Sequence, residues 1–177
     1  PYAAHTTIDA PGHRDSIKNM TTGASQVDVA MTMVPADGNS TTATAKGNRQ
    51  AGGTQGQTCQ HSRLINLLGV KQIATRVNLM DCDTAAQKRE RYHEIANEMK
   101  NMLVKVGWEK DAVEKTTPVL PSSGWMGDNL FKKSDDLAWW KGRDIECGSE
   151  TIHCNTAYDM LDKLFCVPVR PVSAPMR

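Results

Sequence analysis

The chain alternates between short apolar runs with strand character and longer stretches in which apolar residues recur at helical spacing. The longest strand-like run is VDVAMTMVPAD, which ends near Asp37 and is mostly apolar, as in strands buried on both faces of a sheet. The sequence predicts four strands, at residues 6–9, 27–37, 70–78 and 117–121. Helices are predicted after them, at residues 16–26, from 58 to about 69, from 84 to 106 and at 158–165.

The clearest predicted helix runs from about Thr84 to Val106. Thr84 and Gln87 have the spacing of a capping box, and Gly107 follows as a stop signal. Apolar residues recur along one face at spacings of three and four: Tyr92, Ile95, Met99, Leu103 and Val106. The mixed charges of the KRER run are expected to form its solvated face.

The predicted helix from Thr58 ends at Gly69, and its apolar face is formed by Leu64, Leu67 and Leu68. The segment before it, from Gly38 to Gln57, is rich in Gly, Ser, Thr, Asn and Gln. A connection of this length is expected to be a functional loop or a mobile insertion.

Alternating strands and helices predict an α/β domain with a mainly parallel sheet. In such folds ligands bind at the carboxyl ends of the strands. Three polar clusters occupy those positions here, DAPGHRD after the first strand, NLMDCD after the third and SSGWMGDN after the fourth. The carboxyl edge of the sheet is therefore the candidate functional site.

Bulk composition narrows the class of protein. The 177 residues suit one domain with a substantial core, and the formal net charge of +1 gives no electrostatic argument for binding nucleic acid or an anionic membrane. No apolar run approaches the ~20 residues of a membrane span, so no membrane partner is expected. The five cysteines contain no C-x-x-C pair and predict reduced thiols in a cytoplasmic protein. Cys147, His153 and Cys154 match no familiar zinc spacing, which favours packing over a metal site.

The DAPGHRD cluster fits phosphate and metal chemistry. Asp9 at a strand end can hold Mg²⁺ through water, and the N–H of Gly12 can approach a phosphate with no side chain in the way. His13 can orient a water for attack on phosphorus. The alternative is a tight turn with a capping aspartate.

The NLMDCD cluster fits recognition of a guanine edge. The amide of Asn78 can bond the ring acceptors, and the carboxylate of Asp81 can accept from the ring N–H and the exocyclic amine. On its own, N-x-x-D is also common in ordinary turns.

Taken together with Ser123 and Gly124, these clusters resemble the GTP-binding domain of elongation factor Tu-class translational GTPases. The segments IDAPGHRDSIKNM, SQVDVAMTMVPADGN, GQTCQHSRLINLLGVKQ, SGWMGDN and VPVRP are similar to elongation factor 1-alpha and to the related elongation factor-like protein. The resemblance covers nearly the whole chain and implies a P-loop GTPase-type, Rossmann-like fold.

The resemblance also implies roles for single residues. Asp9 and Gly12 match the second switch motif, which senses the γ-phosphate and Mg²⁺, and His13 matches the histidine that positions the hydrolytic water. Asn78 and Asp81 match the guanine-specificity motif. The loop that closes over the base is matched by Ser123, Gly124 and Trp125. The implied cofactors are GTP or GDP with Mg²⁺, and the implied partners are aminoacyl-tRNA, the ribosome and a guanine-nucleotide exchange factor.

The sequence departs from the family in several places. No G-x-x-x-x-G-K-[ST] phosphate loop occurs in it, so the chain is expected to start downstream of the first strand, this loop and the first switch, with most triphosphate affinity missing. The lost strand is expected to expose the inner edges of the strands at 6–9 and 27–37. Leu79 replaces the family's lysine, Arg76 puts a charge in a buried strand, and other substitutions are Ser16, Cys59 and Cys166.

Two functional hypotheses follow. The first is a fragment of a working translational GTPase, with residues 1–167 as a partial GTP-binding domain and residues 168–177 as the start of a linker to a second domain. The second is a divergent paralogue or remnant without catalysis, which persists as a binding module or without function.

Overall fold

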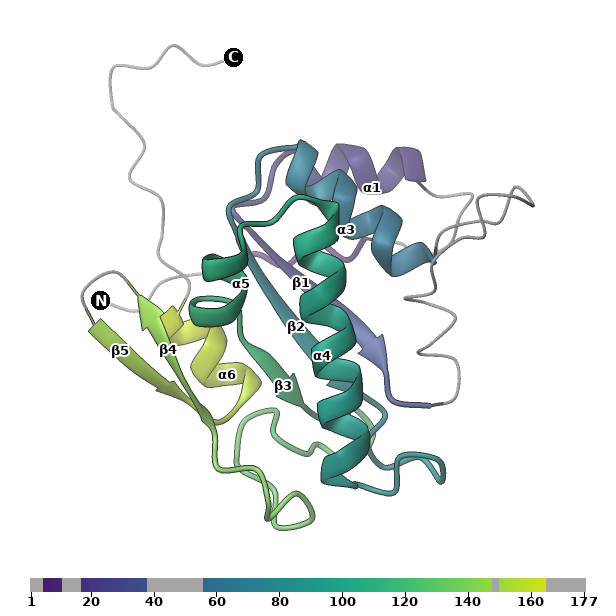
Figure 1. Ribbon diagram of the computed structural model, residues 1–177, viewed down its shortest axis with the longest axis vertical. Coiled ribbons are helices and arrows are strands. Elements are labelled where there is room, and N and C mark those ends of the chain that lie inside the picture. Colours follow the sequence, from purple (N-terminus) through teal and green to yellow (C-terminus); the bar gives the residue numbers. More distant parts are fainter. Residues whose placement is uncertain (1–4, 11–16, 38–55, 148–149, 165–177) are drawn as a thin grey trace.

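A computed structural model of the chain describes residues 5–10, 17–37, 56–147 and 150–164. Its centre is a three-stranded parallel sheet in the order β1-β2-β3 (Figure 1). The strands are β1 at Val29–Pro35, β2 at Gln72–Asn78 and β3 at Val119–Pro121. The α/β class and the parallel sheet predicted from the sequence are confirmed.

Parallel register brings the carboxyl ends of the strands to one edge of the sheet. Pro35 lies opposite Asn78, and Val77 lies opposite Pro121. The backbone N–H of Ala36 extends the β1–β2 pairing by donating to the carbonyl of Asn78 at 2.7 Å. The segments that follow the three strands therefore start side by side.

Helices α3 at Gln57–Leu67 and α4 at Arg89–Val106 pack together and against the sheet, α3 next to β1 and α4 next to β2 (Figure 1). The α4 helix has a buried face at spacings of three and four. The residues of that face are Tyr92, Ile95, Ala96, Met99, Met102 and Leu103. It ends at Gly107, whose φ of 112° is the left-handed conformation that suits glycine. A Cβ there would also lie 2.8 Å from Asn66 Nδ2 of α3, so glycine lets the two helix ends approach.

Shorter elements complete the described part. Helix α1 is at Ile17–Ala24, within the helical stretch predicted at 16–26, and α5 is at Lys110–Lys115. Strands β4 at Arg143–Cys147 and β5 at Glu150–Cys154 form an antiparallel hairpin. The chain then enters α6 at Ala157–Asp159 and continues as one π-helical turn, η3, at Met160–Leu164. The sequence predicted neither α5 nor the hairpin.

The predicted strand at residues 6–9 is wrong. Residues 5–10 are exposed and have no regular secondary structure. In the described sheet β1 is an edge strand, and residues 5–10 do not pair with its outer edge. A run of β-branched residues without a paired strand gains too little from local propensity to form one.

The predicted capping box at Thr84 and Gln87 is also wrong, because the helix begins later, at Arg89, after Lys88 as N-cap. Ala86 and Gln87 have positive φ angles of 42° and 56°, and the N–H of Gln87 donates to the carbonyl of Met80 at 2.7 Å. The segment between β2 and α4 is therefore a closed turn. A real capping box joins Thr156 and Asp159 at the start of α6, which begins just before the last helix predicted at residues 158–165.

One side chain departs from its predicted environment, and a second agrees with it. Leu67 is 76% exposed, and Ile65 takes its place in the core. Arg76 is half-buried, and its Nε and Nη2 atoms are buried without a hydrogen-bond partner among the described residues. Burial lowers the pKa of its guanidinium. The expected cost of a charge in this strand is therefore present in the structure.

Within the described ranges, no helix is long and apolar enough to cross a membrane. Among the described residues, Cys59, Cys82 and Cys154 form no disulfide, and Cys154 is fully buried in the core.

The hydroxyl of Tyr92 links α4 to the sheet, because it donates to the carbonyl of Val119 at 2.7 Å in a buried environment. We expect Tyr92→Phe to lower the free energy of unfolding by about 1 kcal/mol, since the carbonyl of Val119 loses this donor. The control is Tyr158→Phe, because Tyr158 is 46% exposed and should change stability little. Urea denaturation measures both, and equal stability of the two variants would contradict the role of this bond.

Candidate base-binding site

The candidate site is formed by the segments that follow β2 and β3. The side-chain Oδ1 of Asn78, the last residue of β2, accepts a hydrogen bond from the backbone N–H of Gly124 at 2.9 Å. This bond joins two polar clusters that are 46 residues apart in the sequence. A carboxamide held by its oxygen keeps its Nδ2 amide as a donor.

Backbone hydrogen bonds hold the same two segments together nearer the sheet. The N–H of Ser122 donates to the carbonyl of Val77 at 2.8 Å, and the N–H of Met80 donates to the carbonyl of Ser122 at 3.3 Å. Met80 is itself fully buried. The positions of Asn78 and Gly124 are thus fixed by strand pairing and by a core side chain.

Asp81 carries the most informative electrostatic feature of this site. Its Oδ1 atom is buried and has no hydrogen-bond partner among the described residues. A buried acceptor without a donor costs about 1–3 kcal/mol, so native proteins usually satisfy such groups with a ligand, an ion or water. Asp81 Oδ1 is therefore an unsatisfied acceptor, and an N–H or O–H donor that reached it would relieve this cost.

The turn that carries Asp81 is closed at both ends. Besides the bond from Gln87 to Met80, the Nε1 of Trp139 donates to the carbonyl of Gln87 at 2.7 Å. Trp139 packs with the ring of Tyr92, with ring centroids 5.3 Å apart. Through this bond and this ring contact, Trp139 ties the turn to Tyr92 of α4.

The loop after β3 is held by Asp128 and Asn129, two residues that were not predicted as part of the site. Asn129 is buried at a φ of 54°; its Nδ2 donates to the carbonyl of Pro121 and its Oδ1 accepts from the N–H of Ser134. Asp128 accepts from the hydroxyl of Ser134 at 2.6 Å. The polar run GDN is the signal that could have identified both residues.

Ser123 and Trp125 lie in this loop in different environments. Ser123 is fully buried, and its hydroxyl accepts from the N–H of Met126 at 3.0 Å, which makes a tight turn. Trp125 is 87% exposed at the tip of the turn. An exposed aromatic ring at this place is available to stack on a planar ligand.

Leu79 has a φ of 61°, the left-handed conformation that leucine rarely adopts. Its side chain is 37% exposed and lies between Asn78 and Met80 in the sequence. This residue follows Asn78 and precedes Asp81 by two positions, and these are the two residues predicted to recognise the base.

The structure leaves the predicted phosphate and metal residues untested. Asp9 is exposed in the irregular stretch 5–10, and Gly12 and His13 lie outside the described residues. Among the described residues there is no group of three or more His, Cys, Asp and Glu side chains that could hold a metal ion. His153, which the sequence analysis considered with two cysteines, contacts Asp144 instead, with Nδ1 and Oδ1 2.5 Å apart.

Comparison with known proteins assigns a family to this arrangement. The family described as "Elongation factor Tu GTP binding domain" matches residues 3–165. Elongation factor 1-alpha of Plasmodium falciparum (isolate K1 / Thailand) is 44% identical over 177 residues, which are 100% of this chain and 34% of that protein. Elongation factor 1-alpha of Blastocystis hominis is 40% identical over 173 residues, 97% of this chain and 35% of that protein. The chain spans about a third of the length of these relatives.

Solved structures agree on the fold. Sup35 complexed with GDP aligns with a TM-score of 0.62 at 22% identity, over 81% of this chain and 31% of that chain. Sup35 complexed with GMPPNP aligns with a TM-score of 0.56 at 24% identity, over 68% of this chain and 28% of that chain. At these identities the likeness shows the fold alone, and it confirms the predicted GTPase-type fold.

The bond between Asn78 and Gly124 gives a prediction that needs no ligand. We expect Asn78→Ala to speed hydrogen exchange of the Gly124 amide by about tenfold, because the amide loses its acceptor at 2.9 Å. Exchange measured by NMR tests this, with Asn101→Ala, an exposed amide on α4, as the control. Unchanged exchange of Gly124 in Asn78→Ala would show that the bond does not hold the loop.

Proposed function

The chain belongs to the elongation factor Tu family of GTP-binding domains, and we propose that the site at the ends of β2 and β3 binds the guanine base of GTP or GDP. The observation that carries this proposal is the hydrogen bond from Gly124 to Asn78 beside a buried, unpaired oxygen of Asp81. It supports the proposal because both segments of the family's base-recognition site meet in one place.

The donor and acceptor pattern fits guanine. The edge of guanine that carries N1–H and the exocyclic amine presents two donors, and the carboxylate of Asp81 supplies acceptors for them. The Nδ2 amide of Asn78 supplies a donor for a ring acceptor on the other side of the base. Adenine lacks the N1–H donor and would leave the Asp81 oxygen unpaired, which makes discrimination between the bases strong.

The remaining site residues are proposed by resemblance to the family. Ser123, Gly124 and Trp125 would close over the base, with the exposed indole of Trp125 stacking on it. Asp9 would hold Mg²⁺ through water and Gly12 would face the γ-phosphate. His13 would orient the attacking water.

For the longer protein, we propose the family role of carrying aminoacyl-tRNA to the ribosome with GTP hydrolysis and recharging by an exchange factor. Residues 1–167 would be the GTP-binding part and residues 168–177 the beginning of a linker. The matches to elongation factor 1-alpha across the whole chain support this proposal.

A second candidate is a module that binds without catalysing hydrolysis. The observations that favour it are the leucine at position 79, where the family has lysine, and the unpaired guanidinium atoms of Arg76 in β2. The leucine removes the ammonium group of the family's lysine from position 79, and the unpaired guanidinium atoms add a desolvation cost in β2.

Asp81→Asn tests the base assignment in a chain extended at its N-terminus with the family's phosphate-loop segment. An amide in place of the carboxylate presents a donor to a guanine donor, so affinity for GDP should fall about 100-fold while affinity for xanthosine diphosphate rises. Fluorescent-nucleotide titration measures both affinities. Asp83→Asn, an exposed carboxylate two residues away, is the control. An equal loss in both variants, or no change in base preference, would refute the role of Asp81.

His13→Ala separates the two candidates in the same extended chain. For a working GTPase we expect the rate of GTP hydrolysis to fall about 100-fold or more, while GDP affinity stays within about threefold, because the imidazole acts on the water and not on the base. Single-turnover hydrolysis with parallel GDP titration gives both numbers. Equal losses would indicate a structural histidine, and an unmeasurable rate before mutation would favour the binding module.

A further inference from the structure

A basic groove lies on α4, α5 and β4, away from the base site. Its volume is about 740 Å³, and it is open to solvent and not an enclosed cavity. The α4 helix starts near the turn after β2 and runs away from it, so the groove flanks the opposite half of the helix (Figure 1). Its lining includes the polar and basic side chains of Asn97, Lys100, Asn101, Lys105, Lys110 and Arg143.

The groove has an excess of positive charge. Three lysines and one arginine line it, against a single carboxylate, that of Glu114. Lys110 Nζ lies 4.0 Å from Glu114 Oε1, so this carboxylate offsets one of the four cations. Arg143 uses one guanidinium nitrogen, Nη2, to donate to the backbone carbonyl of Glu114 at 2.6 Å, and this neutral partner adds no negative charge.

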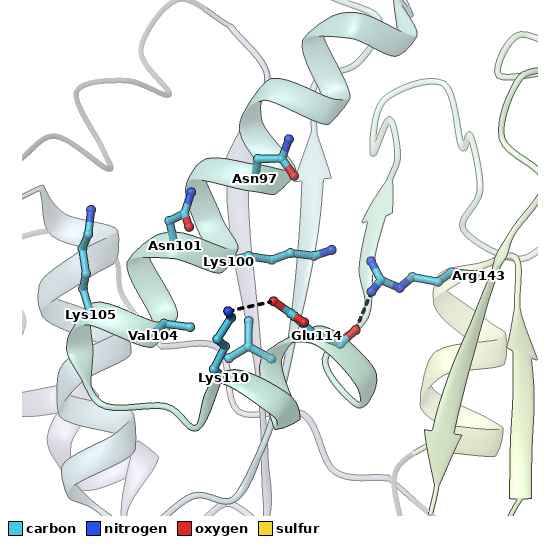
Figure 2. A pocket seen from close by; sticks show the side chains of 9 residues that line it. Asn97, Lys100, Asn101, Val104, Lys105, Lys110, Glu114 and Arg143 are labelled. Carbon is cyan, nitrogen blue, oxygen red and sulfur yellow. Dashed lines mark hydrogen bonds and ion pairs between the residues drawn. The ribbon is translucent and has the colours of Figure 1, made fainter.

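Lys100 is the cation at the centre of the groove. Figure 2 shows its amino group aimed into the space between Arg143 and Glu114. Within the described ranges no carboxylate forms a salt bridge with it, although Glu114 lies close enough to favour its charge. Burial and the neighbouring charge of Arg143 lower the pKa of Lys100. A bound anion would relieve this repulsion, as counter-charges do in other clefts lined by one sign of charge.

The geometry points to a small polyphosphate-bearing anion as the ligand of this groove. The cations come from three elements, and Figure 2 shows the ends of Lys100, Lys110 and Arg143 around Glu114, whereas Lys105 points away from them. The volume of 740 Å³ lies within the range of about 300–1,000 Å³ of small-molecule sites. Arg143 supplies a planar fork of donors and the lysines supply point charges, which together suit the many oxygens of a phosphate chain. The amides of Asn97 and Asn101 add neutral donors at the upper side of the groove (Figure 2).

This ligand class is favoured over a macromolecule because the charge is local. The whole chain has a net charge of +1, and the excess positive charge of the groove comes from four cations against one carboxylate. Binding of RNA requires many phosphate contacts along an extended surface. A compact anion needs only the few cations around Glu114.

The test uses the full chain and sodium tripolyphosphate, which carries no base, at about 100 mM KCl. Isothermal titration should show binding that weakens at least tenfold in Lys100→Gln/Arg143→Gln. NMR should place the shift changes on the amides of α4, α5 and β4. The matched control is Lys132→Gln/Lys133→Gln, which removes two exposed cations outside the groove and should leave the affinity unchanged.

Arg143 also bonds to α5, so thermal unfolding must confirm that the double variant folds. Lys100→Gln alone serves as the second variant, because its ammonium makes no such bond, and it should weaken binding at least threefold. Equal affinity of groove and control variants would overturn the proposal. So would shift changes centred on the Gly124 amide, which would place the anion at the nucleotide site, or tighter binding of poly-glutamate or single-stranded RNA to the groove. None of these results bears on whether Asp81 recognises guanine.

Discussion

The parallel pairing of β2 with its two neighbours is the constraint on which the site depends. Val77 lies opposite Val34 on one side and Pro121 on the other, so all three strands end at the same level. A shift of one residue would turn every side chain of β2 to the other face of the sheet. Asn78 would then point away from the loop after β3, and the bond to Gly124 could not form. The register of the buried strands thus sets the geometry of the polar site at their ends.

Much of this arrangement could be predicted from the sequence, for physical reasons. A mostly apolar run identified β1, the segment VKQIATRVN identified β2, and the periodic apolar face identified α4. The start of α4 was missed because a capping pattern at Thr84 is a local signal, whereas the turn is decided by positive φ angles at Ala86 and Gln87 that composition does not encode. The hairpin and α5 were missed because their apolar residues are few. The strand at 6–9 was predicted from propensity alone and has no partner strand in the described sheet.

The residues of the candidate site were also predicted only in part. Asn78, Asp81 and Gly124 were predicted because each follows a recognisable strand, and the structure places Asn78 and Gly124 in contact. Asp128 and Asn129 were not predicted, because their part is to hold the backbone of the loop through bonds to Ser134 and Pro121. Supporting residues of this kind depend on tertiary contacts that no spacing rule contains. Asp9 remains a prediction, since its proposed partners are phosphate and metal and not protein groups.

Leu79 connects the end of β2 to the turn that carries Asp81. A leucine in the left-handed conformation costs roughly 1–2 kcal/mol, so something must fix it there. With the left-handed turn at Leu79, the side chain of Asn78 bonds to Gly124 at the end of the strand. The side chain of Met80, one residue later, enters the core and is fully buried. Burial of a methionine side chain contributes about 1.5–3 kcal/mol, which is enough to offset the strain. The side chain at position 79 contributes little to this balance between backbone strain and burial, because it stays 37% exposed. The backbone turn at this position is therefore held by its neighbours, and a lysine could adopt the same conformation with its amino group in solvent or directed to a ligand.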